Sequence, residues 1–261
     1  AEADLVAVFD ADLVAVFATT TIVRLGLKKN ELSRLSTETL VSIVQSCQLA
    51  GIKKLDISDN NLHELGLDGL ASIICEWARS DMGELNICGN KLGYIKGEVV
   101  KTGSITSKGQ KRLVLRNNIL HSHGDKLVTM INACANIGVT MLDLSYNSLA
   151  FMGEENIIRL IAACRGSAIE EIDLTSNLLF GLGNEFLVSL ILACEGTRVT
   201  ALNLSKNQLY LKMGNSHLLI LIKACISVGI KKLDLSNNKL GKVEDPDWHQ
   251  ILEICDGIYF I

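Results

Sequence analysis

Short segments in which apolar residues alternate with polar ones recur along the chain at nearly constant intervals. LDLSNNKL at 233–240 is one example, and LDLSYNSL at 142–149 has the same pattern. The two leucines of each LDL lie two positions apart, so in an extended chain their side chains point to the same face. Each segment therefore predicts a short strand with one buried face. The eight such segments begin at Leu25, Leu55, Leu85, Leu113, Leu142, Ile172, Leu202 and Leu233.

A second pattern, with the period of an α-helix, lies between most of these strands. Ile157, Leu160, Ile161 and Cys164 are spaced i, i+3, i+4 and i+7, which places them on one side of a helix. Ser36 is expected to cap the first helix, because its hydroxyl can accept a hydrogen bond from a first-turn N–H. The same spacing occurs at 40–47, 127–134, 187–194 and 218–225.

Each predicted strand is followed by an asparagine at a fixed position. The asparagine amide can both donate and accept hydrogen bonds, so it can satisfy backbone groups where the chain turns away from the strand. Stacked repeats would place these side chains above one another in a buried ladder. The eight residues are Asn30, Asn60, Asn90, Asn118, Asn147, Asn177, Asn207 and Asn238.

The segments fit the pattern L-x-L-x-x-N-x-L, with Ile allowed for Leu, and start 28 to 31 residues apart. This pattern resembles the leucine-rich repeat family from about residue 22 to the C-terminal residue. The repeat length and full helices are similar to the ribonuclease-inhibitor-like class. That resemblance implies an α/β leucine-rich-repeat solenoid (a horseshoe) of about eight repeats, with a concave parallel β-sheet and convex α-helices. The LDLSxN pattern is also similar to leucine-rich-repeat effectors of intracellular bacterial pathogens.

We expect the repeat domain to span residues 22–261. Residues 1–21 contain ADLVAVF twice, at 3–9 and at 11–17. This copy is open to three interpretations: a vector-derived remnant, an uncertain sequence assignment, or a terminal cap of the solenoid. Near the other end, GIYFI at 257–261 predicts a ninth strand.

The repeat at 93–110 is irregular, because it lacks the helical spacing of apolar residues and contains several glycines. Two interpretations remain open. It is either a decayed repeat or a flexible feature on the convex side that a partner uses.

Most cysteines occupy one position of the repeat, eight residues before the next strand segment. Trp77 stands at that position in the second repeat. A position that accepts tryptophan is a packing position, and a free cysteine packs as a small apolar residue. We therefore expect free thiols in a reduced, intracellular chain. The residues at this position are Cys47, Cys134, Cys164, Cys194 and Cys225.

Charge and motifs argue against several classes of function. The net charge of −4 and the pI of about 5.8 favour neither a nucleic acid nor an anionic membrane as partner. His121 and His123 are too few to hold a metal ion. The sequence has no Gly-rich phosphate loop, nucleophile elbow or Cys–His arrangement. We expect a monomeric protein that is not an enzyme and that uses no cofactor or metal.

The strand positions that avoid the core are expected to face solvent on the concave side. Cations predominate there in the first four repeats and acidic residues in the last four, with Tyr146 near the middle. Much of this polarity fits an ordinary solvated face, but a central aromatic residue between charged flanks is typical of a protein interface. The candidate partner-binding residues are Arg24, Lys54, Arg112, Arg116, Met141, Asp143, Tyr146, Glu171, Asp173, Lys206, Lys232 and Asp234.

These features favour a non-enzymatic scaffold that binds, and inhibits or recruits, another protein through its concave face. The resemblance to bacterial effectors implies a host protein or a co-secreted enzyme as the partner. It also implies a place in the cytoplasm, including that of a host cell into which the protein is delivered. The alternative is an adaptor or sensor fragment whose effector domain lies beyond the C-terminus.

Overall fold

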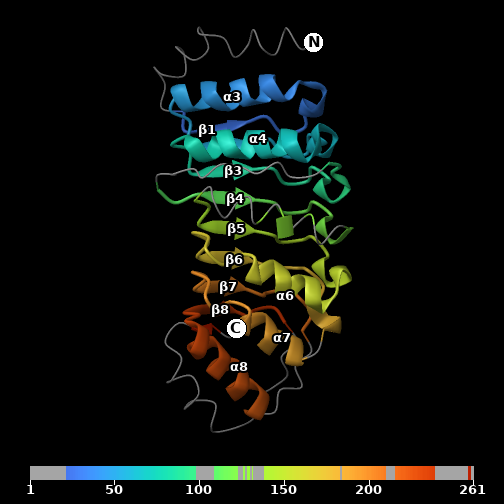
Figure 1. Ribbon diagram of the computed structural model, residues 1–261, viewed down its shortest axis with the longest axis vertical. Helices are drawn as coiled ribbons and strands as arrows, with labels where there is room; N and C mark the ends of the chain where they lie inside the picture. Colours follow the sequence, from blue (N-terminus) through green and yellow to red (C-terminus); the bar gives the residue numbers. More distant parts are fainter. Residues whose placement is uncertain are drawn as a thin grey trace.

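In the computed structural model, nine parallel strands form one sheet in the order of the chain. The structure describes residues 22–97, 109–122, 138–182, 184–209, 215–238 and 258–259, together with 126, 128, 129 and 131. Figure 1 shows the strands stacked along the long axis of the molecule. They are β1 (Arg24–Gly26), β2 (Lys54–Asp56), β3 (Glu84–Asn86), β4 (Arg112–Val114), β5 (Met141–Asp143), β6 (Glu171–Asp173), β7 (Ala201–Asn203), β8 (Lys232–Asp234) and β9 (Ile258–Tyr259).

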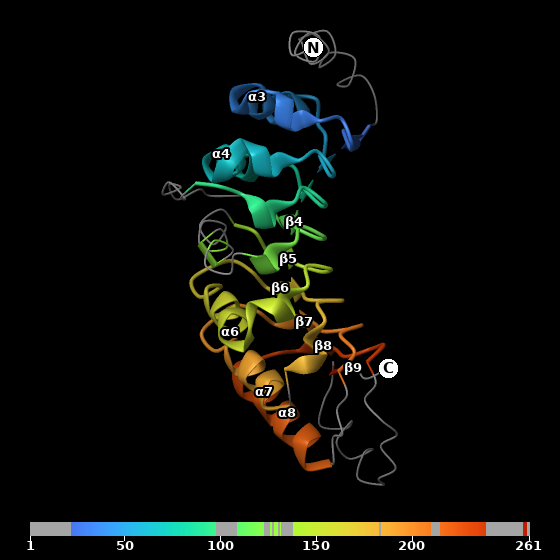
Figure 2. The same cartoon turned by 90° about the vertical axis from the view of Figure 1, so that its right-hand side faces the viewer.

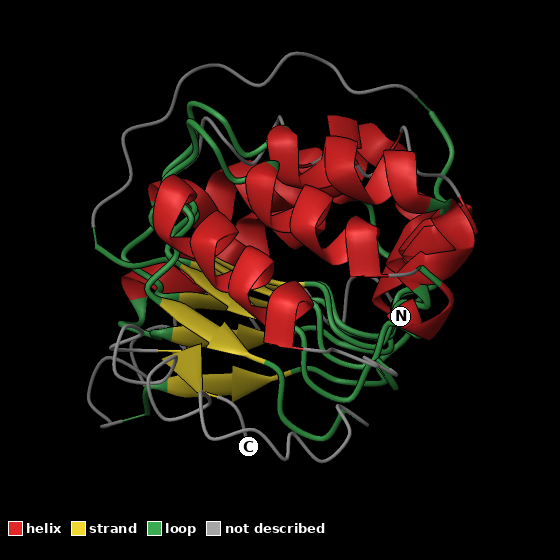
Figure 3. Cartoon of the chain, turned by 90° about the horizontal axis from the view of Figure 1, so that it is seen from below, coloured by secondary structure: helices red, strands yellow, loops and turns green. Residues whose placement is uncertain are grey.

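The helices lie on one side of this sheet, and no helix of the described residues covers its other side (Figures 2 and 3). None of them is both long and apolar enough to span a lipid bilayer. The α-helices are α3 (Thr37–Leu49), α4 (Gly66–Arg79), α6 (Glu154–Ala162), α7 (Asn184–Leu192) and α8 (Asn215–Val228). Short 3-10 helices follow the turns: η1 (Leu32–Arg34), η2 (Leu62–Leu65), η3 (Leu92–Tyr94), η4 (Leu120–Ser122), η5 (Leu149–Met152) and η6 (Leu179–Gly181).

This architecture confirms the predicted leucine-rich-repeat solenoid. Neighbouring strands pair in register, so that Leu85 lies beside Leu113 and Leu113 beside Leu142. The ninth strand predicted from GIYFI is also present, because Ile258 pairs with Leu233. Three of the predicted features, the copied segment at 3–9 and 11–17, residues 98–108 of the irregular repeat and most of the helix at 127–134, lie outside the described residues.

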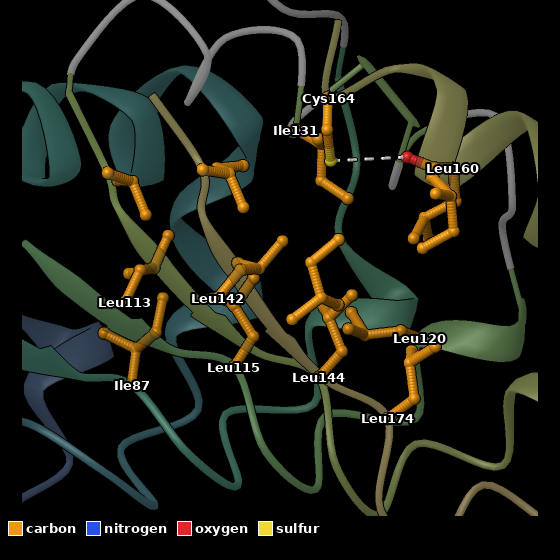
Figure 4. Packing of buried hydrophobic residues seen from close by; sticks show 14 of the residues in the cluster. Ile87, Leu113, Leu115, Leu120, Ile131, Leu142, Leu144, Leu160, Cys164 and Leu174 are labelled. Atoms are coloured by element: carbon orange, nitrogen blue, oxygen red, sulfur yellow. Dashed lines mark hydrogen bonds between the residues drawn. The ribbon is translucent and has the colours of Figure 1, made fainter. Parts of the chain in front are cut away.

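The core lies between the sheet and the helices. Leu142 and Leu144 of one repeat are fully buried, and they pack beside Leu113 and Leu115 of the repeat before it (Figure 4). The helical side contributes the buried positions predicted from the i, i+3, i+4, i+7 spacing, such as Leu160. Because each repeat buries its apolar face against the next, the stack supplies the core that a single repeat could not.

The asparagine ladder is confirmed by its hydrogen bonds. The backbone N–H of Asn118 donates to Oδ1 of Asn147 at 2.7 Å, and the N–H of Asn147 donates to Oδ1 of Asn177 at 2.9 Å. The side-chain amide of Asn147 donates to the carbonyl oxygens of Leu115 at 3.0 Å and Leu144 at 2.9 Å. One side chain thus ties two successive turns together, which explains why the residue recurs in each repeat.

The cap of the first helix is also confirmed. The backbone N–H of Thr39 donates to Oγ of Ser36 at 3.2 Å. This bond satisfies one of the amide groups that the first turn of α3 leaves without an intrahelical partner.

The cysteines at the repeated position are packing residues where the structure describes them. Cys47, Cys164 and Cys194 are buried, and burial raises the pKa of each thiol to about 12. The six described cysteines carry free thiols. Cys134 and Cys255 lie outside the described residues.

Among the six described cysteines, Cys88 should react fastest with a thiol reagent in the native protein. Its side chain is half-buried on the sheet face, whereas the other five are buried. We expect labelling of Cys88 to be about tenfold faster or more, because reaction requires an accessible thiolate. Peptide mass spectrometry of briefly alkylated protein at pH 8 would measure this, and all eight thiols of the chain should react after unfolding without reductant. Equal labelling of Cys88 and Cys164 would contradict the expectation.

Candidate functional site

The sheet face opposite the helices, called the concave face here, contains two adjoining hollows. Glu84 and Arg112 line both of them. The larger, of about 560 Å³, lies over the turns that follow the strands, and we call it the tyrosine hollow. Its lining residues are Lys28, Asp59, Glu84, Asn86, Cys88, Arg112, Val114, Arg116, Asn117, Asp143 and Tyr146.

The second hollow, of about 460 Å³, lies at the start of the strands. It brings together predicted site residues from different repeats, namely Lys54, Arg112, Met141 and Glu171. The tyrosine hollow brings together a second group, Arg112, Arg116, Asp143 and Tyr146. The remaining candidates line neither hollow: Arg24, Asp173, Lys206, Lys232 and Asp234.

A chain of ion pairs joins the two hollows. Nζ of Lys54 lies 3.6 Å from Oε2 of Glu84, and Nη1 of Arg112 lies 3.6 Å from the same oxygen. Nη2 of Arg112 is 3.2 Å from Oδ2 of Asp143. These contacts run across β2, β3, β4 and β5. Individually such partly exposed pairs add little stability, but together they fix the side chains in place.

Asp143 departs from the expectation that the concave strand positions face solvent. It is buried, and its Oδ1 accepts hydrogen bonds from the backbone N–H of Ser145 at 3.1 Å and its Oγ at 2.6 Å. Val114, at the equivalent position of β4, is buried as well. Asp143 is buried because the side chain of Arg112 covers it from the neighbouring strand, which lies only about 4.8 Å away.

The expected excess of positive charge in the first repeats is largely compensated in the folded chain. Arg24 pairs with Asp56 at 3.8 Å, and Lys28 pairs with Asp59 at 3.3 Å. In both cases the acid comes from the repeat that follows. Asp173 of the last repeats forms no ion pair within the described residues, and its Oδ1 accepts the backbone N–H of Thr175 at 2.8 Å. This aspartate therefore also closes the turn after its strand.

Tyr146 lines the tyrosine hollow, and the residue is 40% exposed. Its backbone is left-handed, with φ of 59°, and the same holds for Asp59 and Asn117 at the same place in their repeats. The guanidinium carbon of Arg116 lies 4.1 Å from the centre of the Tyr146 ring, in a cation–π contact. Tyr146 and Arg116 therefore form one stacked unit.

No sequence pattern pointed to Lys111, which is buried between two repeats and lines the second hollow. Its Nζ donates to the carbonyl oxygens of Ser80 and, at 2.7 Å, Met82, and it lies 5.4 Å from the Trp77 ring centre. Burial lowers the pKa of Lys111 to about 8. Tryptophan at a position that holds cysteine elsewhere was the one signal of an altered core at this point.

His121 contacts two residues of the next repeat. Its ring lies 5.5 Å from that of Phe151, and its Nδ1 is 3.2 Å from the carbonyl oxygen of Asn147. His123 lies outside the described residues. Across the part of the chain that the structure describes, no group of three or more potential metal-ligating side chains comes together.

The chain is similar to known leucine-rich-repeat proteins. A family model described as Leucine Rich Repeat matches residues 229–251. Among solved structures, the chain is similar to the leucine-rich repeat-containing protein LegL7 from Legionella pneumophila, with 20% identity over 95% of each chain and a TM-score of 0.48. No curated protein matches the chain. With eight strand–asparagine repeats in register and a Leucine Rich Repeat match at one of them, the chain has the leucine-rich-repeat fold.

Proposed function

We propose that this chain is a non-enzymatic scaffold that binds another protein through its concave face, with the tyrosine hollow at the centre of the contact. The observation that carries the proposal is the exposed Tyr146, which stacks on Arg116 and lines a hollow of about 560 Å³. Aromatic and arginine side chains dominate the energy of protein interfaces when they lie near the centre of the contact.

The ion pairs of the concave face support the same proposal. Glu84 and Arg112 are held by partners on neighbouring strands, so their side chains are ordered before a partner arrives. Side chains that are already ordered lose less conformational entropy on binding. The concave face thus offers a rigid, polar surface with an aromatic residue in the middle.

We further propose that the partner is a host protein or a co-secreted enzyme, which the scaffold inhibits or recruits in the cytoplasm. This part rests on the resemblance of the LDLSxN repeats to leucine-rich-repeat effectors of bacterial pathogens. The net charge of −4 gives no general attraction to nucleic acid or an anionic membrane. A monomer is proposed because the binding face is then free for a different protein.

Replacing Tyr146 with alanine should weaken partner binding about thirtyfold, since removal of a central anchor typically costs about 2 kcal/mol or more. The partner would first be identified by pull-down and mass spectrometry, and its affinity then measured by titration calorimetry. Tyr146→Phe keeps the ring and should bind within about threefold of the parent. Asn237→Ala is the matched control, because Asn237 is an exposed left-handed residue at the same position of the last repeat and is not among the candidate binding residues.

The role of the acidic residues in the last repeats can be tested with a second variant. Asp173→Lys is suited to this purpose because Asp173 is only half-buried, whereas Asp143 is buried and its reversal would disturb the fold. A partner affinity that is unchanged in both Tyr146→Ala and Asp173→Lys would show that binding takes place elsewhere on the molecule.

A further inference from the structure

The tyrosine hollow contains one cation whose charge has no counterpart. Of its three cationic side chains, Lys28 pairs with Asp59 at 3.3 Å, and Arg112 pairs with Glu84 and Asp143. These pairs use all three carboxylates that line the hollow. Arg116 has no carboxylate within 4.0 Å in the part of the chain that the structure describes. Lys54 of the neighbouring hollow also pairs with Glu84, at 3.6 Å. Four cations therefore face three carboxylates, which leaves one positive charge uncompensated, that of Arg116.

We propose that Arg116 is a receptor for a carboxylate on an acidic segment of the partner protein. The proposal rests on the function proposed for the concave face and names the chemistry of what binds there. An arginine guanidinium binds a carboxylate through two parallel N–H···O hydrogen bonds, a geometry that lysine cannot reproduce.

The stacking of Arg116 on Tyr146 prepares it for this role. The guanidinium carbon lies 4.1 Å from the ring centre, so the ring holds the group from one face. Its N–H groups lie in the guanidinium plane and make no hydrogen bond to the described residues. An arginine held by stacking loses less rotational freedom when it binds than a free one does.

The charges around the hollow also set the direction in which a partner would bind. In the later repeats Glu171, Asp173 and Asp234 outnumber Lys206 and Lys232, and none of the five forms an ion pair within the described residues. The excess of acidic residues would repel an acidic segment there. An acidic segment of the partner is thus expected to bind beside Arg116. Neutral or basic residues of the partner are expected to lie above β6 to β8. Such complementary charges fix orientation and register more than they raise affinity.

Selection from a phage-displayed library of random 12-residue peptides on the full chain would test this proposal. We expect the enriched peptides to share an aspartate or glutamate. Binding of the synthesised peptide should fall about tenfold or more on Arg116→Gln, and about as much when the acidic residue of the peptide is changed to its amide. The two changes together should weaken binding no further than either one alone, which identifies them as a pair.

Arg34→Gln is the matched control. Arg34 is also exposed, but it lies on η1 and pairs with Glu31 at 3.0 Å, so its loss should leave peptide binding unchanged. Arg116→Lys keeps the charge without the planar group and should bind clearly less well than the parent. Circular dichroism would verify that each variant is folded.

The outcomes distinguish this proposal from the one on which it rests. Peptides that require Tyr146 but bind equally to Arg116→Gln would overturn the carboxylate receptor and leave the concave-face scaffold standing. Peptides whose binding is unchanged by both Tyr146→Ala and Arg116→Gln would contradict both the scaffold and the carboxylate receptor. Enrichment of basic peptides, or of none, would likewise contradict an acidic partner segment.

Discussion

Replacing Asn147 with alanine should lower the free energy of unfolding by about 4 kcal/mol, because it leaves several buried polar groups without partners. Its Oδ1 accepts from the N–H groups of Asn118 at 2.7 Å and Leu120 at 3.4 Å. Its Nδ2 donates to carbonyl oxygens of the same repeat and of the repeat before it. Alanine can neither accept nor donate these bonds, and the site is closed to water.

Asn30→Ala is the matched control at the first rung of the ladder. Asn30 is exposed, and within the described residues its amide donates one hydrogen bond, to the carbonyl oxygen of Lys28 at 3.3 Å. Its loss should cost less than about 1 kcal/mol. Urea unfolding followed by circular dichroism would give both values. Equal shifts in the two variants would mean that the ladder adds no stability beyond that of a surface asparagine.

Replacing Gly93 with alanine should lower the free energy of unfolding by about 3 kcal/mol, through a steric clash rather than a lost bond. A Cβ on Gly93 would lie 2.0 Å from the carbonyl oxygen of Ile119 and 2.8 Å from its carbon. Both are backbone atoms, so no side chain can move aside. The N–H of Gly93 also donates to the carbonyl oxygen of Asn118 at 2.8 Å, which holds the two turns together.

Gly26→Ala provides the comparison for this substitution. A Cβ on Gly26 meets no atom within 4 Å, and the residue is exposed in β1. We expect its stability to change by no more than about 0.5 kcal/mol. Thermal and urea unfolding of the two variants would separate the clash from a general effect of alanine. A Gly93→Ala protein as stable as Gly26→Ala would show that the turns of η3 and η4 can move apart freely.

The repetition in the sequence predicted the fold because each repeat states the same local pattern. The alternation in LDL required a strand with one buried face, and the spacing of Ile157, Leu160, Ile161 and Cys164 required a helix. Neither pattern can bury its apolar face alone, so eight of them in register had to stack. The asparagine ladder was predictable for the same reason, because a turn that recurs in every repeat leaves the same backbone groups without partners each time.

The charges of the concave face were readable in the sequence, but their pairing was not. Lys54 and Glu84 lie thirty residues apart in the chain, and stacking brings them to 3.6 Å. A count of charges per repeat suggested a basic end and an acidic end. In the folded molecule the cations of one repeat reach the acids of the next, so that much of the positive excess is neutralised locally.

The tertiary structure alone decided which polar side chains lie inside. Lys111 and Asp143 have side chains that hydropathy places in solvent, yet Lys111 reaches two backbone carbonyl groups beside Trp77, and Asp143 is enclosed by Arg112 and Ser145. The contact between Arg116 and Tyr146 was likewise decided by the tertiary structure alone. The period of the sequence determines which positions share a face, because that depends on local geometry. Which side chains meet on that face depends on the reach and conformation of each one, and these are fixed only when neighbouring repeats pack.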